Sequence, residues 1–93
     1  MNTLHVYAQE IWHDEAYIAG TREALEALRT AIDQALAAGQ GHMQSFANDG
    51  EGYTVHVVQM TEDQADKMKV PYTDEVATDK SPEKFGPWSL VHA

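Results

Sequence analysis

The spacing of hydrophobic and polar residues changes twice along the chain and divides it into segments. Residues 4–11, LHVYAQEI, alternate loosely, with Leu4, Val6 and Ala8 on one side, which is typical of a strand. The polar residues HDE at 13–15 indicate a turn, and AYIAG at 16–20 alternates again. These two runs predict a β-hairpin.

From residue 22 the spacing becomes helical. Thr21 is a good N-cap because its hydroxyl can accept a hydrogen bond from the first helical turn, and Gly20 allows a sharp bend before it. In REALEALRTAIDQALAA, apolar side chains recur every three or four residues and form one stripe: Leu25, Leu28, Ile32, Ala35 and Leu36. Gly39 and Gly41 indicate the end of this amphipathic helix, whose apolar stripe is expected to face the sheet.

A second hairpin is predicted after the helix. HMQSFA at 42–47 and YTVHVVQM at 53–60 are strand candidates, and NDGEG at 48–52 is a strong turn signal. The second strand carries apolar groups on both faces, with Tyr53, Val55 and Val57 on one of them. It is therefore expected to lie centrally in a sheet or to contact a partner subunit.

The remaining segments complete an α+β fold. Thr61 and Gln64 form a capping-box pattern for a short helix, EDQADKMK, at 62–69. Residues 72–93 are expected to form a C-terminal arm anchored by Phe85, Trp88 and Leu90. The prediction is a single domain, 1–93, with an antiparallel sheet of about four strands in the order ββαββ. One long amphipathic helix is expected to cover one face of this sheet.

Charge and composition narrow the possible partners. Fifteen acidic and six basic residues give a net charge of −9, which disfavours direct nucleic-acid binding. The acidic surface is compatible with a basic protein partner, or with solubility alone. No basic segment precedes an apolar run, and no apolar stretch has membrane-spanning length, so a cytoplasmic location without membrane contact is expected. A chain of 93 residues builds a thin core, which favours a homo-oligomer, a dimer or larger.

Candidate chemistry is sparse. The absence of cysteine excludes disulfides, thiolate zinc sites and cysteine nucleophiles. Histidines stand at positions 5, 13, 42, 56 and 92 without metal-site spacing, although His5 and His56 could meet across paired strands. Paired carboxylates lie in turns, where they usually bond nearby N–H groups. We therefore expect no metal, no cofactor and no catalytic residue, and a protein that is not an enzyme.

The start of the long helix is the best candidate for a ligand site. A helix N-terminus presents free N–H donors and partial positive charge, and Thr21 and Arg22 add a hydroxyl and a guanidinium. Trp12 and Tyr17, close in sequence, could provide a flat surface for a nucleobase. Two further tyrosines from another segment or subunit are expected to contribute, Tyr53 and Tyr72.

The alternative for this region is purely structural. In that interpretation Thr21 caps the helix, Arg22 pairs with Glu26, and Trp12 and Tyr17 cover the sheet.

Three segments carry a resemblance: EAYIAGTREALEALRTAIDQAL, DGEGYTVHVV and VPYTDE, within residues 15–75. They resemble small proteins carried by phages, prophages and bacterial mobile elements, and the strand–Gly–helix part also resembles immunity proteins of bacterial toxin systems. The phage resemblance implies anti-defence activity in the host cytoplasm. The expected function is a non-enzymatic sponge that sequesters a small phosphate-bearing ligand, such as a cyclic nucleotide immune signal. The alternative is an acidic inhibitor or immunity protein that binds a basic partner surface.

Overall fold

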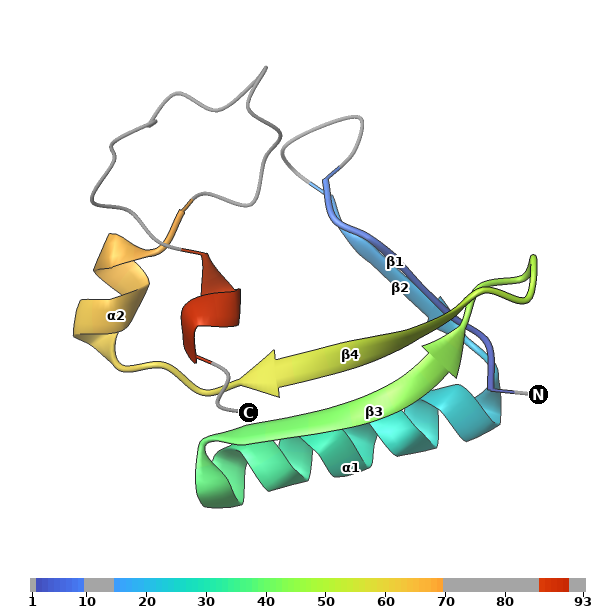
Figure 1. The fold of residues 1–93 in the computed structure, drawn as a ribbon, viewed down its shortest axis with the longest axis horizontal. Coiled ribbons are helices and arrows are strands. Elements are labelled where there is room, and N and C mark those ends of the chain that lie inside the picture. The colour runs from blue at the N-terminus through green and yellow to red at the C-terminus, as the bar shows by residue number, and fades with distance from the viewer. Residues whose placement is uncertain (1, 10–14, 70–85, 91–93) are drawn as a thin grey trace.

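The computed structural model describes residues 2–9, 15–69 and 86–90, which form four strands, two α-helices and one 3-10 turn (Figure 1). The elements, in chain order, are β1 (Leu4–Tyr7), β2 (Tyr17–Gly20), α1 (Arg22–Ala38), β3 (Gln40–Phe46), β4 (Gly52–Val58), α2 (Glu62–Lys67) and η1 (Pro87–Leu90).

The first hairpin pairs β1 and β2 in antiparallel register, with Leu4 opposite Gly20 and Tyr7 opposite Tyr17. Strand β1 is shorter than the predicted 4–11. Gln9 has a positive φ of 57°, so the chain has already left the extended conformation there. Leu4 and Val6 lie on one face of the hairpin, as the alternation predicts, and His5 and Tyr7 lie on the other.

Helix α1 begins and ends where its capping residues predict. The Thr21 side chain accepts a hydrogen bond from the Ala24 N–H at 3.3 Å. Gly39 adopts the left-handed conformation, φ 93°, and its N–H donates to the Ala35 carbonyl at 2.8 Å. The prediction of a helix over 22–38 with a Thr21 cap is confirmed.

The face of α1 that is buried differs from the predicted stripe. Ala35 is buried and Leu28 packs against the core, as predicted, but Ala24 and Ala31 are buried in place of Leu25, Ile32 and Leu36, which are exposed. The reason is how closely the helix approaches β3. A Cβ placed on Gly41 would lie 2.2 Å from the Ala31 carbonyl oxygen, so the contact surface takes small side chains and the larger ones lie at its flank.

Strands β3 and β4 form a second antiparallel hairpin with α1 along one face (Figure 1). The turn between them is closed by the Ala47 N–H donating to the Glu51 carbonyl at 2.9 Å, which confirms the predicted turn. Met43 lies opposite Val55, and both face the core cluster. That cluster comprises Leu4, Ala24, Ala31 and Met43, flanked by Ala27, Leu28, Val55 and Val57.

The four strands form two separate two-stranded sheets, so the prediction of one four-stranded sheet is wrong. The sheets meet where Thr3 forms a parallel bridge with Phe46, which is the last residue of β3. Beyond Phe46 the chain turns back, and β1 has no further length of β3 to pair with. The first hairpin therefore rises steeply from the second (Figure 1). Strand β4 is consequently an edge strand rather than a central one.

The C-terminal elements lie at the other end of the molecule. Helix α2 has the predicted capping box, with the Gln64 N–H donating to Thr61 Oγ1 at 3.1 Å and the Thr61 N–H donating to Gln64 Oε1 at 2.9 Å. Beside α2, the Lys69 ammonium lies 5.9 Å from the Trp88 ring of η1. Much of the predicted arm, including Phe85, lies outside the described residues. In the described part of the chain, neither helix has the length and apolar character needed to cross a membrane.

Candidate functional site

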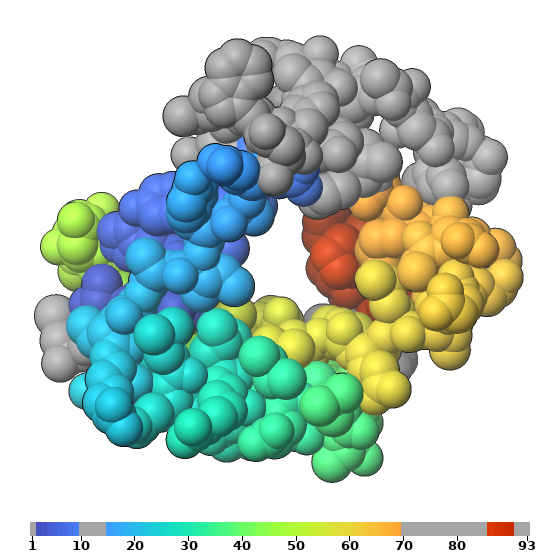
Figure 2. All heavy atoms as spheres, turned by 180° about the vertical axis from the view of Figure 1, so that it is seen from behind, coloured from blue at the N-terminus to red at the C-terminus, as the bar shows by residue number. Residues whose placement is uncertain are grey.

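A hollow of about 290 Å³ lies along the edge of β1 that does not pair with β2. It is lined by Leu4, His5, Val6, Tyr7, Ala47 and Tyr53, and we call it the β1 hollow. The first hairpin contributes one wall, and the turn after β3 with the start of β4 contributes the other. Figure 2 shows from behind how the blue hairpin stands apart from α2 and η1 at the opposite end.

Two hydrogen bonds fix the histidine of the hollow. The Asn48 N–H donates to His5 Nε2 at 3.1 Å, and His5 Nδ1 lies 2.6 Å from the Tyr7 hydroxyl oxygen. Because Nε2 accepts a bond, the proton of the neutral ring sits on Nδ1 and is donated to Tyr7. The Tyr7 O–H is then left as a donor for another molecule, since no acceptor for it lies among the described residues.

The backbone of β1 adds a second donor and an acceptor. The Thr21 N–H donates to the Thr3 carbonyl, so Thr3, His5 and Tyr7 direct their backbone groups toward β2. The alternate residues, Leu4 and Val6, direct theirs toward the hollow. The Leu4 carbonyl accepts the Tyr53 hydroxyl, which fixes that ring. The Val6 N–H and C=O have no partner in the described part of the chain.

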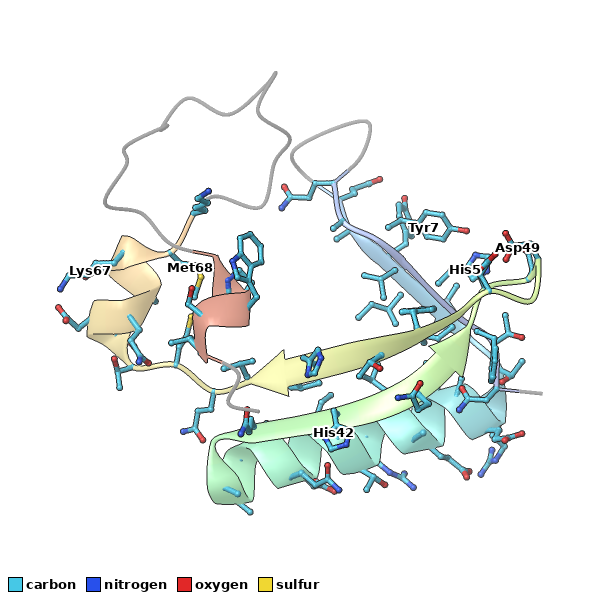
Figure 3. The ribbon with its side chains drawn as sticks, in the orientation of Figure 1. His5, Tyr7, His42, Asp49, Lys67 and Met68 are labelled. Carbon is cyan, nitrogen blue, oxygen red and sulfur yellow. The ribbon has the colours of Figure 1, made fainter. Side chains whose placement is uncertain are left out.

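Aromatic rings gather beside these polar groups. The His5 and Tyr7 rings are 5.7 Å apart between centroids and tilted by 60°. Tyr17 lies directly opposite Tyr7 in the β-ladder and so shares its face of the hairpin. Figure 3 shows His5 and Tyr7 close to the turn that carries Asp49. The region can therefore offer ring surfaces together with two donors and one acceptor.

The start of α1 was predicted as the anion site, but its own side chains reduce its attraction for an anion. Thr21 already occupies the Ala24 N–H, and Glu23 places a carboxylate in the first turn. The Arg22 side chain is 92% exposed and pairs with Glu26 at 2.9 Å. The Thr21 cap and the Arg22–Glu26 pair are the contacts expected if this region is purely structural. An exposed pair of this kind is worth only about 0.3–0.5 kcal/mol, so Arg22 is free to exchange Glu26 for another anion.

The other predicted site residues are dispersed. Tyr17 is 59% exposed, and its hydroxyl donates to Glu15 at 2.7 Å, which raises the tyrosine pKa above its ordinary value. Tyr53 lines the β1 hollow. Trp12 and Tyr72 lie outside the described residues. The structure thus places Tyr53 beside the hollow, Tyr17 on the adjoining face and Thr21 with Arg22 at the helix start.

Two residues of the hollow, His5 and Tyr7, were not predicted as ligand-binding residues. Their alternation with Leu4 and Val6 places them together on the face away from the core, and this was the available signal. The contact of His5 with Asn48 had no such signal, because the two residues lie 43 positions apart.

His56 lies opposite His42 rather than near His5, so the suggested His5–His56 pair does not form. No group of three or more potential metal ligands occurs within the described ranges 2–9, 15–69 and 86–90. The chain matches no protein-family model, no curated protein and no solved structure.

Proposed function

We propose that this protein binds a small molecule bearing a flat heterocyclic ring, and that it does so without transforming it. The β1 hollow carries this proposal. Ring faces, the Tyr7 O–H and the Val6 backbone pair converge there. A ring with adjacent hydrogen-bond donor and acceptor groups complements that set, and a nucleobase is the class that fits best.

The size of the hollow limits the affinity of one chain. Its volume of about 290 Å³ is at the lower end for ligand pockets, and a nucleoside-sized fragment fills it. Base–aromatic stacking contributes roughly 1–3 kcal/mol and each hydrogen bond about 0.5–1.5 kcal/mol. One stack and three hydrogen bonds, each taken at the middle of its range, contribute about 5 kcal/mol, which corresponds to a Kd of roughly 0.2 mM. Tighter binding needs additional contacts.

Two sources of additional contacts belong to the proposal. One is a phosphate held by Arg22 and Thr21 at the start of α1, which makes the ligand a nucleotide. The other is a second copy of the chain, which would bury the exposed apolar side chains Leu25, Ile32 and Leu36 and could bring its own rings to a shared site. A homo-oligomeric nucleotide binder of phage origin would act in the host cytoplasm as a sponge for a cyclic nucleotide immune signal.

A matched ligand panel tests the ring and the phosphate separately. Calorimetric titration of the full chain with nucleosides and with the corresponding nucleotides, cyclic forms included, reports each contribution. Tyr7→Phe removes the free hydroxyl and keeps the ring, so we expect an affinity about tenfold lower for both ligand types. Arg22→Ala is expected to lower the affinity for nucleotides and to leave the affinity for nucleosides unchanged.

Tyr17→Phe is the matched control, because the Tyr17 hydroxyl is occupied by Glu15. Its affinity should equal that of the natural chain. Absence of binding across the panel, or a Tyr7→Phe variant that binds as well as the natural chain, would contradict the proposal. Mass spectrometry of the titrated ligands checks that none is converted, since a new product would indicate an enzyme.

A protein-binding role is the second candidate, and the exposed apolar flank of α1 favours it. Leu25, Ile32 and Leu36 recur at helical spacing along one line of the helix. Singly exposed apolar residues are ordinary, but a row of three on one helix is typical of a contact surface. The net charge of −9 on this chain would attract a basic partner at long range.

Ionic strength separates the two candidates. Capture of a basic host protein by the chain should decline steeply between low and high salt, because exposed charges are screened beyond about 8–10 Å near physiological ionic strength. Leu36→Lys should abolish such capture and leave nucleoside binding intact. Equal capture by the natural chain and by Leu36→Lys would remove this candidate.

A further inference from the structure

His42 and His56 lie directly opposite each other on β3 and β4, on the face of the ribbon that points away from α1. Both side chains are exposed, and Figure 3 marks His42 on β3. Their ring centroids are 6.4 Å apart, and the rings are tilted by 39°. Within the described residues, neither ring forms a hydrogen bond, so the ring nitrogens are available to a ligand.

The separation suits one shared metal ion. A Zn²⁺ ion lies about 2.0–2.1 Å from a ligating imidazole nitrogen, which at a tetrahedral angle places the centroids of two rings that share it roughly 5 Å apart. The observed separation of 6.4 Å is about 1 Å wider, and rotation of the two exposed side chains can bring the rings together by that amount. The strand pairing holds the two Cα atoms at a fixed separation, which reduces the conformational freedom lost on binding.

The immediate neighbours are compatible with a cation. The adjacent cross-strand pair on the same face is Gln44 with Thr54, whose side chains bond to each other at 2.8 Å. No basic side chain occupies this face within β3 or β4. The net charge of −9 attracts divalent cations to the chain as a whole.

We propose that His42 and His56 together bind one borderline divalent metal ion, Zn²⁺ or Ni²⁺, through one ring nitrogen each. Neutral imidazole is a preferred ligand for these ions, whereas Mg²⁺ and Ca²⁺ prefer oxygen. Two protein ligands leave coordination positions open to water or to a donor from another molecule. The site is independent of the β1 hollow and of the function proposed for it.

Titration of the full chain with Ni²⁺ and with Zn²⁺, followed by calorimetry, tests the site. His42→Gln and His56→Gln should each lower the affinity at least tenfold. The double variant should bind no more weakly than either single variant, because losing one ligand already destroys a two-ligand site. His92→Gln and His13→Gln are the matched controls and should bind as the natural chain does.

Thermal unfolding gives a second readout. Metal should raise the Tm of the natural chain and of the controls, and leave the Tm of His42→Gln and His56→Gln unchanged. The variants should unfold like the natural chain without metal, because both side chains are exposed. Equal affinity in all variants, or losses in the two single variants that add in the double variant, would overturn the proposal.

Discussion

At Gly41 the helix packs very closely against the β3–β4 ribbon. A Cβ there would lie 2.2 Å from the Ala31 carbonyl oxygen and 2.8 Å from Gln34 Cβ. Gly41→Ala should therefore force the helix away from β3 and destabilise the protein by roughly 1–3 kcal/mol, measured by urea denaturation. Gly50→Asn is the comparison, because Gly50 has open space around it and a positive φ, so a loss there reports backbone strain without steric overlap. Equal stability of Gly41→Ala and the natural chain would show that the contact relaxes without cost.

The Tyr17–Glu15 hydrogen bond makes a second residue-scale prediction. The bond stabilises the neutral phenol and so raises the Tyr17 pKa. Its contribution to stability is present below the unfolded pKa of about 10 and is lost as pH rises through the higher folded value. Glu15→Ala removes the acceptor and should return the Tyr17 pKa toward its ordinary value. Ultraviolet titration of the phenolate checks this, and the Tyr17→Phe variant identifies which transition belongs to Tyr17. An unchanged titration in Glu15→Ala would contradict the bond.

Single residues were predictable where their chemistry is local. The cap formed by Thr21 needs a neighbour three residues away, and the capping box of Thr61 and Gln64 has the same span. The β1 hollow depends instead on contacts of His5 with Asn48 and of Tyr53 with Leu4, which join distant segments. No local pattern contains those contacts. Tyr53 was therefore predicted as a ligand-binding ring, but its place beside Leu4 was not predicted.

At the scale of elements, α1 shows where periodicity is informative and where it is not. Spacing and caps predicted its bounds, because both act within the helix. They predicted the packed side only in part, because Leu28 and Ala35 lie on it and the other three residues of the stripe do not. Leucine and isoleucine are the usual core residues, yet the glycine at position 41 draws the alanine side of the helix against the strand. The identity of one residue on a neighbouring element thus decided the orientation.

Paired substitutions on the two sides of α1 test that orientation. Leu36 is 68% exposed, so Leu36→Ala should change the free energy of unfolding by no more than about 0.5 kcal/mol. Ala31 is 1% exposed, and Ala31→Leu should cost roughly 1–3 kcal/mol by overpacking. Denaturation at low protein concentration limits association. A large loss for Leu36→Ala, of about 2–5 kcal/mol, would mean that the leucine is buried in solution.

At the scale of the whole molecule, two hairpins and a helix meet around the first residues of the chain. The Asn2 carbonyl accepts the Phe46 N–H at 3.1 Å, and the Asn2 side chain donates to the Gln44 carbonyl at 2.8 Å. The buried Ser45 hydroxyl lies 2.9 Å from Asn2 Oδ1. The next residue, Thr3, bridges to Phe46 and accepts from Thr21. We call these contacts of Asn2 and Thr3 with residues 44–46 and Thr21 the clasp. The clasp, and not a continuous sheet, joins the two hairpins. The pattern of a single sequence could not distinguish a clasp from a continuous four-stranded sheet.

Removing the clasp should destabilise the first hairpin more than the second. Asn2→Ala loses two side-chain hydrogen bonds, each worth about 0.5–1.5 kcal/mol. We expect faster amide hydrogen exchange in β1 and β2 than in β3 and β4, because the second hairpin keeps its helix. Asn48→Ala is a suitable control, since its described bond uses the backbone N–H. Equal acceleration in both hairpins would show that the molecule opens as one unit.

The clasp also sets an order of events during synthesis. Asn2 is synthesised before its partner Ser45, which follows 43 positions later. Helix α1 and the β3–β4 ribbon are built from close neighbours and can form as they emerge. The β1–β2 hairpin can also pair within itself early, but it cannot be fixed against the β3–β4 ribbon until residues 44–46 are made, so its docking comes late.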